Sequence, residues 1–323
     1  MQFFARPRIV VSACLGFEAC RYNGETIPVE YIENLKPFCD FITVCPEVEI
    51  GLGVPRDPIR IVEIDGERHL YQPARDRDYT KRMVKFTGKY LEGLTDIDGF
   101  ILKEKSPSCG LNKVKIYPRK GKVSPRAEKT SGFFGGAVLR SFPFAAVEDE
   151  GRLRNFRLRE HFYTRIFASA RFRDVKTSGA TSELVHFHAS CKLLLMAASQ
   201  KELKVLGKIV ANPAGKRFPD MIQDYEKHFH LAFTNLPRYT SHINVLEHAM
   251  GYFKDNLTAE EKSYFLGLLE QYRAKKVPLS APVSVLRSWI ARFEEPYLAD
   301  QFYFEPYPWK LATISDSGRG RDL

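Results

Sequence analysis

Three cysteines stand where apolar, strand-like runs of the chain break into loops. Cys14, Cys45 and Cys109 each come shortly after such a run. The runs are Ile9–Ala13, Phe41–Val44 and Gly99–Lys103. If they are parallel strands of one sheet, the three sulfurs meet at its carboxyl edge, where open α/β sheets bind ligands. Three thiolates without a fourth suggest a metal cluster that keeps one coordination position open.

The cysteine spacing by itself leaves other interpretations open. Intervals of 31 and 64 residues match no compact Cys-x-x-Cys signature of a zinc or ferredoxin site. Each cysteine could instead be a buried structural residue. A competing set of zinc ligands is Cys14, Cys20, Cys39 and Cys45, although a predicted helix separates them. Cys20, Cys39 and Cys191 are interpreted as structural.

Polar side chains beside two of the three cysteines point to catalysis. Glu47 lies two residues after Cys45, and Ser106 and Ser108 precede Cys109. A carboxylate can act as a general base, and a hydroxyl can position a substrate or carry a proton. These neighbours strengthen the prediction of one shared reactive site.

The composition bounds the class of protein. The chain has 323 residues, 44% of them hydrophobic, which predicts two domains with sizeable cores. No run approaches the roughly 20 apolar residues of a membrane span, and the N-terminus lacks the apolar stretch of a signal peptide. We therefore expect a cytoplasmic protein. Six cysteines in a chain of this length are too few for a disulfide scaffold.

The positive charge is concentrated in one segment. Residues 103–176 contain 18 Lys/Arg and 7 Asp/Glu, a net charge of +11, whereas the whole chain carries +10. A basic segment interleaved with aromatic residues predicts a nucleic-acid partner, with a solvated lysine-rich surface as the alternative. The side chains expected to bind RNA are Lys113, Lys115, Arg119, Lys120, Lys122, Arg152, Arg154, Arg157 and Arg159.

Residues 1–176 are predicted to form an α/β domain with a Rossmann-like, doubly wound parallel sheet. Asp65-Gly66 between two apolar runs predicts a β-hairpin. The expected strands are Ile9–Ala13, Phe41–Val44, Ile59–Ile64, Arg68–Tyr71 and Gly99–Leu102, and the expected helices are Pro28–Leu35 and Asp78–Leu94. The expected later elements are a loop over 111–136, a helix from about Ala137, a turn at Val147–Gly151, a basic helix from Arg152 to about Arg171 and a linker at Thr177–Ser182.

Beyond the linker the apolar period changes to about 3.6 residues, which predicts an all-α helical bundle over residues 183–312. Thr258-Ala-Glu-Glu261 has the form of a capping box. The expected helices are Glu183–Ala198, Gln200–Ala211, Phe218–Leu231, Thr240–Phe253, Thr258–Ala274 and Val283–Phe293.

Five motifs occur in a fixed order in the first half: Val11–Gly16, Arg21–Gly24, Cys45–Glu47, Gly51–Arg56 and Lys105–Gly110. Together they resemble the thiouracil desulfidase family over residues 1 to about 165. The helical half resembles the DUF1722 domain often fused to that family, on motifs that include Asn244–His248 and Tyr297–Gln301. The fused form resembles bacterial desulfidases that remove sulfur from 4-thiouridine in transfer RNA.

The resemblance implies a [4Fe-4S] cluster as cofactor and two protein groups at the substrate. The residues that map onto these roles are Cys14, Cys45 and Cys109 for the cluster, and Glu47 with Ser106, or its neighbour Ser108, for the substrate. The chain departs from the family pattern at Cys20, where an aliphatic residue is expected, and at Cys191, where a histidine often stands.

We therefore expect hydrolytic removal of sulfur from 4-thiouridine in transfer RNA, with Glu47 as general base and uridine and sulfide as products. A desulfidase of free 2-thiouracil or a related thiolated base is the alternative within this class. An RNA-binding module with a structural zinc site is the alternative of another class. A dinucleotide-dependent oxidoreductase is disfavoured, because no Gly-x-Gly-x-x-Gly follows the first strand.

Overall fold

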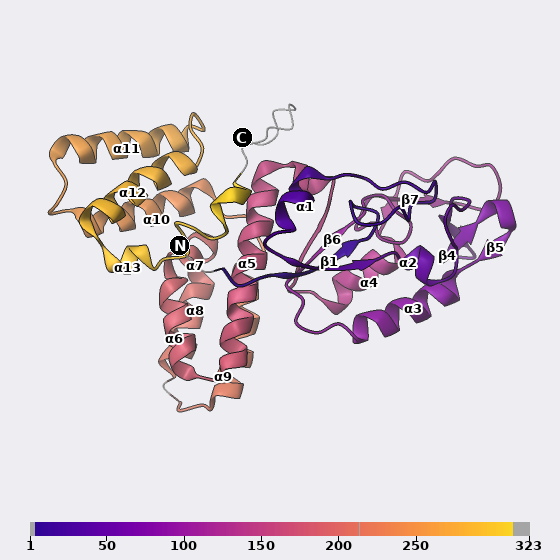
Figure 1. The fold of residues 1–323 in the computed structure, drawn as a ribbon, viewed down its shortest axis with the longest axis horizontal. Coiled ribbons are helices and arrows are strands. Elements are labelled where there is room, and N and C mark those ends of the chain that lie inside the picture. The colour runs from indigo at the N-terminus through magenta and orange to yellow at the C-terminus, as the bar shows by residue number, and fades with distance from the viewer. Residues whose placement is uncertain (1–3, 213, 313–323) are drawn as a thin grey trace. The chain divides into compact units, whose positions relative to one another are not determined.

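A computed structural model gives the fold and describes residues 4–212 and 214–312. The described chain divides into two compact units, residues 4–170 with 310–312, and residues 171–309. The division falls within one long helix, α5 (Phe156–Ser178). Figure 1 shows the chain as a ribbon, with elements of both units labelled.

The first unit is built on a parallel sheet of four strands within the described residues, in the order β2-β1-β6-β9. The strands are β1 (Arg8–Ser12), β2 (Asp40–Val44), β6 (Gly99–Leu102) and β9 (Ala146–Asp149). All of β6 and the last four residues of β1 are buried, as expected for parallel strands covered on both faces. The predicted α/β class with a parallel sheet is confirmed.

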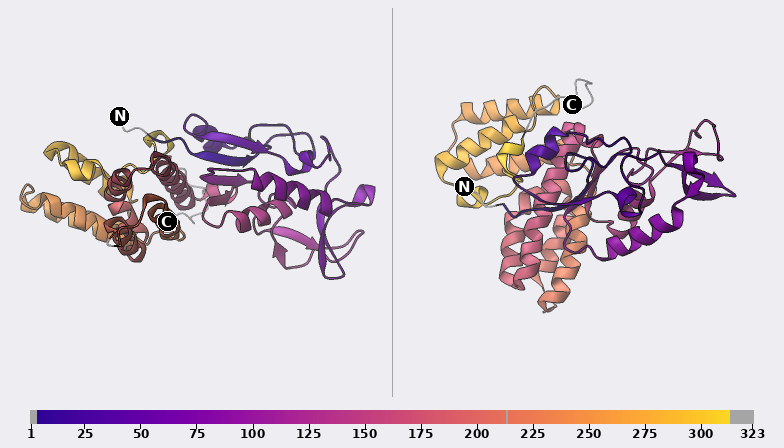
Figure 2. Two further views of the ribbon diagram at one scale, coloured as in Figure 1. Left: turned by 90° about the horizontal axis from the view of Figure 1, so that it is seen from below. Right: turned by 45° about the vertical axis from the view of Figure 1, so that its right-hand side comes forward.

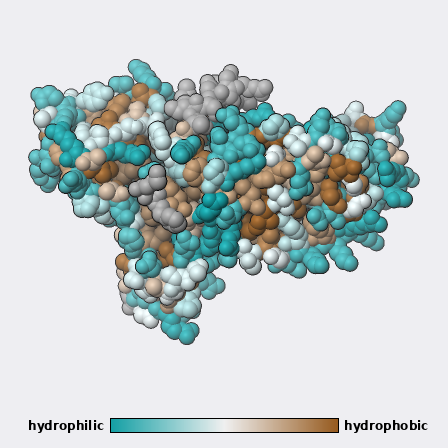
Figure 3. Space-filling model, viewed as in Figure 1, coloured by the Kyte–Doolittle hydropathy of each residue, from teal (hydrophilic) through white to brown (hydrophobic). Residues whose placement is uncertain are grey.

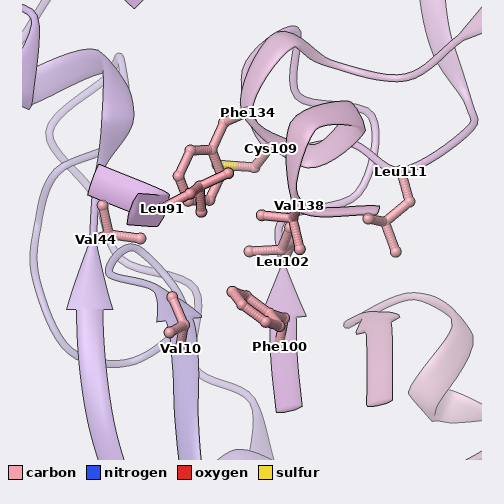
Figure 4. Packing of buried hydrophobic residues seen from close by; sticks show 9 residues of the cluster. All are labelled: Val10, Val44, Leu91, Phe100, Leu102, Cys109, Leu111, Phe134 and Val138. Atoms are coloured by element: carbon pink, nitrogen blue, oxygen red, sulfur yellow. The ribbon is translucent and has the colours of Figure 1, made fainter. Parts of the chain in front are cut away.

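One face of this sheet carries the core shown in Figure 4. Helices α3 (Thr80–Glu92) and α4 (Phe133–Ser141) pack against it. Cys109 belongs to this core and lies beyond the carboxyl end of β6. The core side chains are Val10, Val44, Leu91, Phe100, Leu102, Cys109, Leu111, Phe134 and Val138.

The opposite face is covered by α5. Gly99 of β6 faces this side, because side chains alternate along a strand and Phe100 points into the core described above. A Cβ at Gly99 would lie 2.8 Å from a methyl carbon of Ile166 on α5. The Tyr163 hydroxyl also donates to the carbonyl of Tyr31 in α1 (Glu30–Leu35), at 3.4 Å. The close contact at Gly99 therefore requires a glycine.

A second, mixed sheet of the first unit has the order β5-β4-β3-β7-β8. Its strands are β3 (Arg60–Ile64), β4 (Glu67–Gln72), β5 (Arg77–Asp78), β7 (Val114–Tyr117) and β8 (Lys129–Thr130). The hairpin predicted at Asp65-Gly66 is confirmed, and both turn residues have positive φ, +50° and +79°. This is the pattern of a type I′ turn.

The prediction of an uninterrupted loop over 111–136 is wrong, because β7, β8 and the start of α4 lie in it. Val114 and Ile116 are buried while Lys113 and Lys115 are exposed, so a short period-2 pattern was present. β7 pairs in parallel with β3, which is distant in sequence. A run this short does not identify its pairing partner.

Helix α4 begins at Phe133 instead of near Ala137, because its first turn binds the loop that carries Cys109. The backbone N–H groups of Phe134 and Gly135 donate to the Ser108 carbonyl at 2.9 and 3.0 Å. A Cβ at Gly135 would lie 2.4 Å from the Cys109 carbonyl oxygen. The glycine-rich segment thus permits a backbone-to-backbone approach and does not act as a flexible loop.

The turn predicted at Val147–Gly151 is wrong in its first half, where β9 pairs with β6. Because this run is rich in acidic residues, its sequence did not indicate an edge strand. The two ends of that strand, Ala146 and Asp149, are buried. The long basic helix is confirmed as α5, but it begins at Phe156, after a 3-10 turn at Arg152–Arg154.

The unit formed by residues 171–309 is helical, as predicted, and Figure 2 gives two further views of its helices. The capping box is confirmed, since the Thr258 side chain accepts from the Glu261 N–H and the Glu261 side chain accepts from the Thr258 N–H. The helix predicted over Glu183–Ala198 is two helices, which meet at Cys191. The helices are α6 (Thr181–Ser190), α7 (Lys192–Ala198), α8 (Gln200–Ala211), α9 (Phe218–Ala232), α10 (Tyr239–Met250), α11 (Ala259–Arg273), α12 (Ser280–Phe293) and α13 (Pro296–Ala299).

Within the described residues, no helix combines the length and the apolar character needed to cross a membrane. On the face shown in Figure 3, hydrophobic residues form separate patches among hydrophilic ones.

Replacing Gly135 with Ala is expected to lower the free energy of unfolding by about 1–3 kcal/mol, the usual effect of an overpacked site. The reason is the backbone oxygen that the new Cβ would meet at 2.4 Å. Gly88→Ala in α3 is the matched control, because a Cβ there meets nothing within 4 Å and helix propensity favours Ala by up to about 1 kcal/mol. Urea denaturation of the full chain measures both, and equal effects would contradict the close-approach argument.

Candidate metal centre and active site

The three cysteines expected to meet do line one cavity, whose volume is about 260 Å³. Cys14 follows β1, Cys45 lies between β2 and α2 (Pro46–Glu49), and Cys109 lies in the loop after β6. Cys45 is the N-cap residue of α2, so its backbone is fixed by that helix. The carboxyl edge of the parallel sheet therefore presents three thiols to a single space.

A buried ion pair stands in the wall of the same cavity. The guanidinium of Arg56 donates through Nε and Nη2 to Oε2 of Glu47, at 2.8 and 2.7 Å. The side chains of Arg56 and Glu47 are 4% and 13% exposed. Arg56 also donates to the carbonyls of Cys20 and Gly53, at 3.0 and 2.9 Å. Glu47 is thus fixed in place beside Cys45.

The two candidate serines have different positions relative to Glu47. Ser108 is fully buried and donates to Oε1 of Glu47 at 3.0 Å. Ser106 lines the cavity, lies 3.5 Å from the same oxygen, and accepts from the backbone N–H groups of Ser108 and Cys109 at 3.1 Å each. Ser108 therefore orients the carboxylate, whereas Ser106 is the serine open to a bound molecule.

The surroundings keep the thiols of Cys20, Cys45 and Cys109 protonated at neutral pH. Burial raises the pKa of Cys109 above its ordinary value. A hydrogen bond with the Cys20 thiol, together with burial, raises the pKa of Cys45. The pKa of Cys20 is raised to about 11, first by its hydrogen bond with the Cys14 thiol. A metal bound at the sulfur of Cys45 or Cys109 would therefore have to displace a proton.

The four-cysteine zinc set considered from the sequence does not fit the fold. Cys39 and Cys45 stand at opposite ends of β2, and six residues of extended chain span about 20 Å. A single zinc ion needs all of its ligands within about 2.3 Å of one point. Among the described residues, no three His, Cys, Asp or Glu side chains are grouped to hold one metal ion. The ligands of a cluster bind different irons and need not meet at one point.

The cavity has a cationic lining that sequence reasoning did not single out. Arg21, Arg56, Lys103 and Lys105 all line it. The Lys103 ammonium pairs with the buried carboxylate of Glu150. Arg56 lies in the Gly51–Arg56 motif, but an arginine in a loop motif gives no sign that it is buried.

Most of the residues predicted to bind RNA are on the surface, and none is among the described residues that line the cavity. The loop after β7 instead lies against the second sheet, where Arg60 donates to the Gly121 carbonyl at 2.6 Å. The exposed members are Lys113, Lys115, Arg119, Lys120, Lys122 and Arg154. Arg157 is half-buried, and Arg152 pairs with Glu148 at 2.6 Å.

Arg159 does not lie on the surface that was predicted to bind RNA. It is 3% exposed, and its guanidinium donates to the carbonyls of Leu153 and Arg154 at 2.9 and 3.3 Å. It also lies over the rings of Tyr31 and Phe156. Its donors are used inside the unit and cannot reach a phosphate.

Two protein families match the chain, one in each unit. The 2-thiouracil desulfurase family matches residues 9–150. The DUF1722 family, whose function is unknown, matches residues 192–308. The chain belongs to the 2-thiouracil desulfurase family and carries a DUF1722 domain. The five ordered motifs around the three cysteines all lie within the desulfurase match.

Individual proteins are similar to parts of this chain. The uncharacterized protein YbgA of Escherichia coli (strain K12) is 30% identical over 156 residues, which cover 48% of this chain and 92% of YbgA. The uncharacterized protein YbbK of Bacillus subtilis (strain 168) is 37% identical over 109 residues, 32% of this chain and 72% of YbbK. A solved structure, the [4Fe-4S]-dependent thiouracil desulfidase TudS, is 29% identical with a TM-score of 0.36 and covers 46% of this chain and 93% of that one.

A double-mutant cycle tests the buried pair of the desulfurase unit. Arg56→Met is expected to lower the free energy of unfolding by about 3 kcal/mol, because it leaves a buried carboxylate without its partner. Adding Glu47→Gln removes that charge, so the double variant should be destabilised by less than the sum of the two single effects. Urea denaturation measures all four proteins.

The exposed pair Arg8–Asp96, with side chains 45% and 51% exposed, is the control for this cycle. Its coupling should stay below about 1 kcal/mol. Equal coupling in the two pairs would contradict the structural role given to Arg56.

Proposed function

We propose that the protein is a [4Fe-4S]-dependent desulfidase that removes sulfur from 4-thiouridine in transfer RNA, giving uridine and sulfide. The observation that supports it most is the cavity that joins three cysteine thiols to a fixed glutamate and a cavity-facing serine. The membership in the 2-thiouracil desulfurase family supports a thiolated pyrimidine as the class of substrate.

The residues of the cavity fit an iron–sulfur cluster. Iron–sulfur clusters are held by cysteine thiolates, and Cys14, Cys45 and Cys109 reach one space from three separate strand ends. When bound by these three, the cluster supplies an iron with an open position, which can bind the sulfur of a thiocarbonyl group. On its apolar side, Cys109 belongs to the buried core cluster that also contains Phe134 and Val44.

Glu47 acts as the general base in this proposal. Its Oε2 is occupied by Arg56, while Oε1 accepts from Ser108 and lies toward Ser106 at the cavity. A carboxylate fixed in this way can take a proton from a water molecule that attacks C4 of the base. The reaction balances as C4=S plus water giving C4=O plus hydrogen sulfide, so it needs no electron donor.

Ser106 positions the substrate in this proposal. The Ser106 hydroxyl has its oxygen held by two backbone N–H groups, so its proton is directed toward an acceptor such as Glu47 or a ring atom of the base. Arg21, Lys103 and Lys105 also line the cavity wall, where they pair with Glu25, Glu150 and Glu104 respectively.

The substrate proposal rests on charge. A free thiolated base needs no basic surface, whereas a folded RNA does. The exposed lysines and arginines of residues 113–122 supply such a surface. A thiouridine stacked in a folded RNA must be extruded to enter a cavity of about 260 Å³.

Glu47→Gln should retain the iron content of the wild type and reduce sulfide release by about 10²–10⁴-fold, the usual contribution of a general base. Anaerobic incubation with transfer RNA containing 4-thiouridine, followed by nucleoside analysis, measures turnover, and free 2-thiouracil is assayed in parallel.

Glu49→Gln in the same helix is the control, because Glu49 is exposed, and it should leave turnover unchanged. Undiminished turnover in Glu47→Gln would remove Glu47 from the mechanism. Sulfide release from 2-thiouracil without loss of 4-thiouridine from RNA would overturn the substrate proposal.

Neutralising three exposed residues, Lys113, Lys115 and Arg119, to Gln should weaken transfer RNA binding and flatten its salt dependence. The slope of log K against log[salt] should fall by about 0.9 for each phosphate that the variant no longer neutralises. The control has the same change of charge at Lys201, Lys204 and Lys208, all exposed on α8 in the other unit. Filter binding between low and moderate salt compares the two, and identical slopes would contradict the proposed surface.

A further inference from the structure

Cys20 is a fourth cysteine at the cavity, outside the ligand set taken from the family. It is buried, and its side chain lines the same space as Cys14, Cys45 and Cys109. The other two cysteines of the chain lie elsewhere: Cys39 precedes β2 at its far end, and Cys191 lies between α6 and α7.

Cys20 lies beside two of the three proposed iron ligands, Cys14 and Cys45. All three side chains line the cavity, and interaction with the Cys14 thiol raises the pKa of Cys20 to about 11. Its backbone is also held there, since the Cys20 carbonyl accepts from Arg56 at 3.0 Å and from the Cys45 thiol at 3.7 Å. The Cys109 thiol reaches the cavity from a different loop, the one that follows β6.

Cys14 and Cys20 belong to one loop, whereas Cys45 is fixed by a helix. The loop turns sharply after Cys14, with Gly16 at a φ of +85°. The N–H of Glu18 then donates back to the Ala13 carbonyl at 2.8 Å. Cys14 and Cys20 therefore present their sulfurs to the cavity from one short loop, whereas Cys45 and Cys109 come from other parts of the fold.

We propose that Cys20 is an alternate iron ligand, able to replace Cys14 at this site. The inference rests on the proposed function, because it assumes that Cys14, Cys45 and Cys109 hold a cluster. In the exchange the bond from Cys14 to iron breaks, the Cys20 thiol gives its proton to the departing Cys14 thiolate, and the Cys20 thiolate binds the iron. No electrons are transferred, so the exchange needs no oxidant or reductant.

The test compares iron and acid-labile sulfide per chain after anaerobic reconstitution, together with electron paramagnetic resonance spectra of the reduced proteins. Cys14→Ala is expected to keep most of the wild-type iron, with a shifted spectrum, because Cys20 takes the vacant position. Cys14→Ala combined with Cys20→Ala should reduce the iron content severalfold relative to Cys14→Ala. Cys20→Val replaces Cys20→Ala in a second double variant, so that a cavity in the core cannot account for the loss.

Two controls separate ligand exchange from a general effect of removing a buried cysteine. Cys14→Ala combined with Cys39→Ala should retain as much iron as Cys14→Ala alone, because Cys39 lies at the far end of β2. Cys109→Ala should lose its iron although Cys20 is present, because Cys20 lies beside Cys14 and Cys45. Circular dichroism confirms that each variant is folded.

Equal iron in Cys14→Ala and in both double variants with Cys20 would overturn the role of Cys20 while leaving the proposed function intact. A wild-type protein that takes up no iron under the same conditions would instead overturn the proposed function itself. An unshifted spectrum in Cys14→Ala would show that Cys14 is not a ligand, which also overturns the exchange.

Discussion

The register of β1 between β2 and β6 is the constraint on which the site depends. Ser12 at the end of β1 pairs with Val44 at the end of β2, so both strands leave the sheet at the same level. Cys14 and Cys45 follow these residues almost directly and must therefore be neighbours. Cys109 comes later, and its loop is folded back toward the sheet by the first turn of α4. A slip of one residue in this register would turn each buried side chain of β1 to the other face and separate the thiols.

The same edge of the sheet holds a buried charge that must be compensated. Removing a carboxylate from water is costly unless it is paired and hydrogen-bonded. Glu47 satisfies this condition through Arg56 and Ser108, and Arg56 also donates to the carbonyls of Cys20 and Gly53. The loop of Cys20, the loop of Arg56 and the first turn of α2 are thereby joined. A substitution at any of these positions should therefore alter the arrangement of the cavity wall, although few of these residues would contact a substrate.

Features with a local physical cause were predictable from the sequence, and features with a distant partner were not. Asp65-Gly66 specifies its own turn and Thr258 its own cap, so both predictions are confirmed. The meeting of the three cysteines was predictable because parallel strands share one carboxyl edge. By contrast, the loop predicted over 111–136 includes Gly135, which lies in the first turn of α4 against the Cys109 carbonyl, a neighbour that is distant in sequence. The role of Arg56 was not predictable for a different reason: burial of an arginine beside Glu47 leaves no periodic pattern in a loop.

The distribution of charge limits what the helical domain can add to substrate binding. Residues 177–309 contain 15 Lys/Arg and 14 Asp/Glu, a net charge of +1, against +11 for residues 103–176. Long-range attraction of a polyanion follows net charge and its clustering. If the substrate is transfer RNA, as proposed, its long-range attraction comes from the desulfurase side of the chain and the start of α5. Any contribution of the DUF1722 domain to recognition has to depend on shape or on individual contacts, because a nearly neutral surface supplies little counterion release. Its contribution should therefore depend less on salt than that of the basic segment.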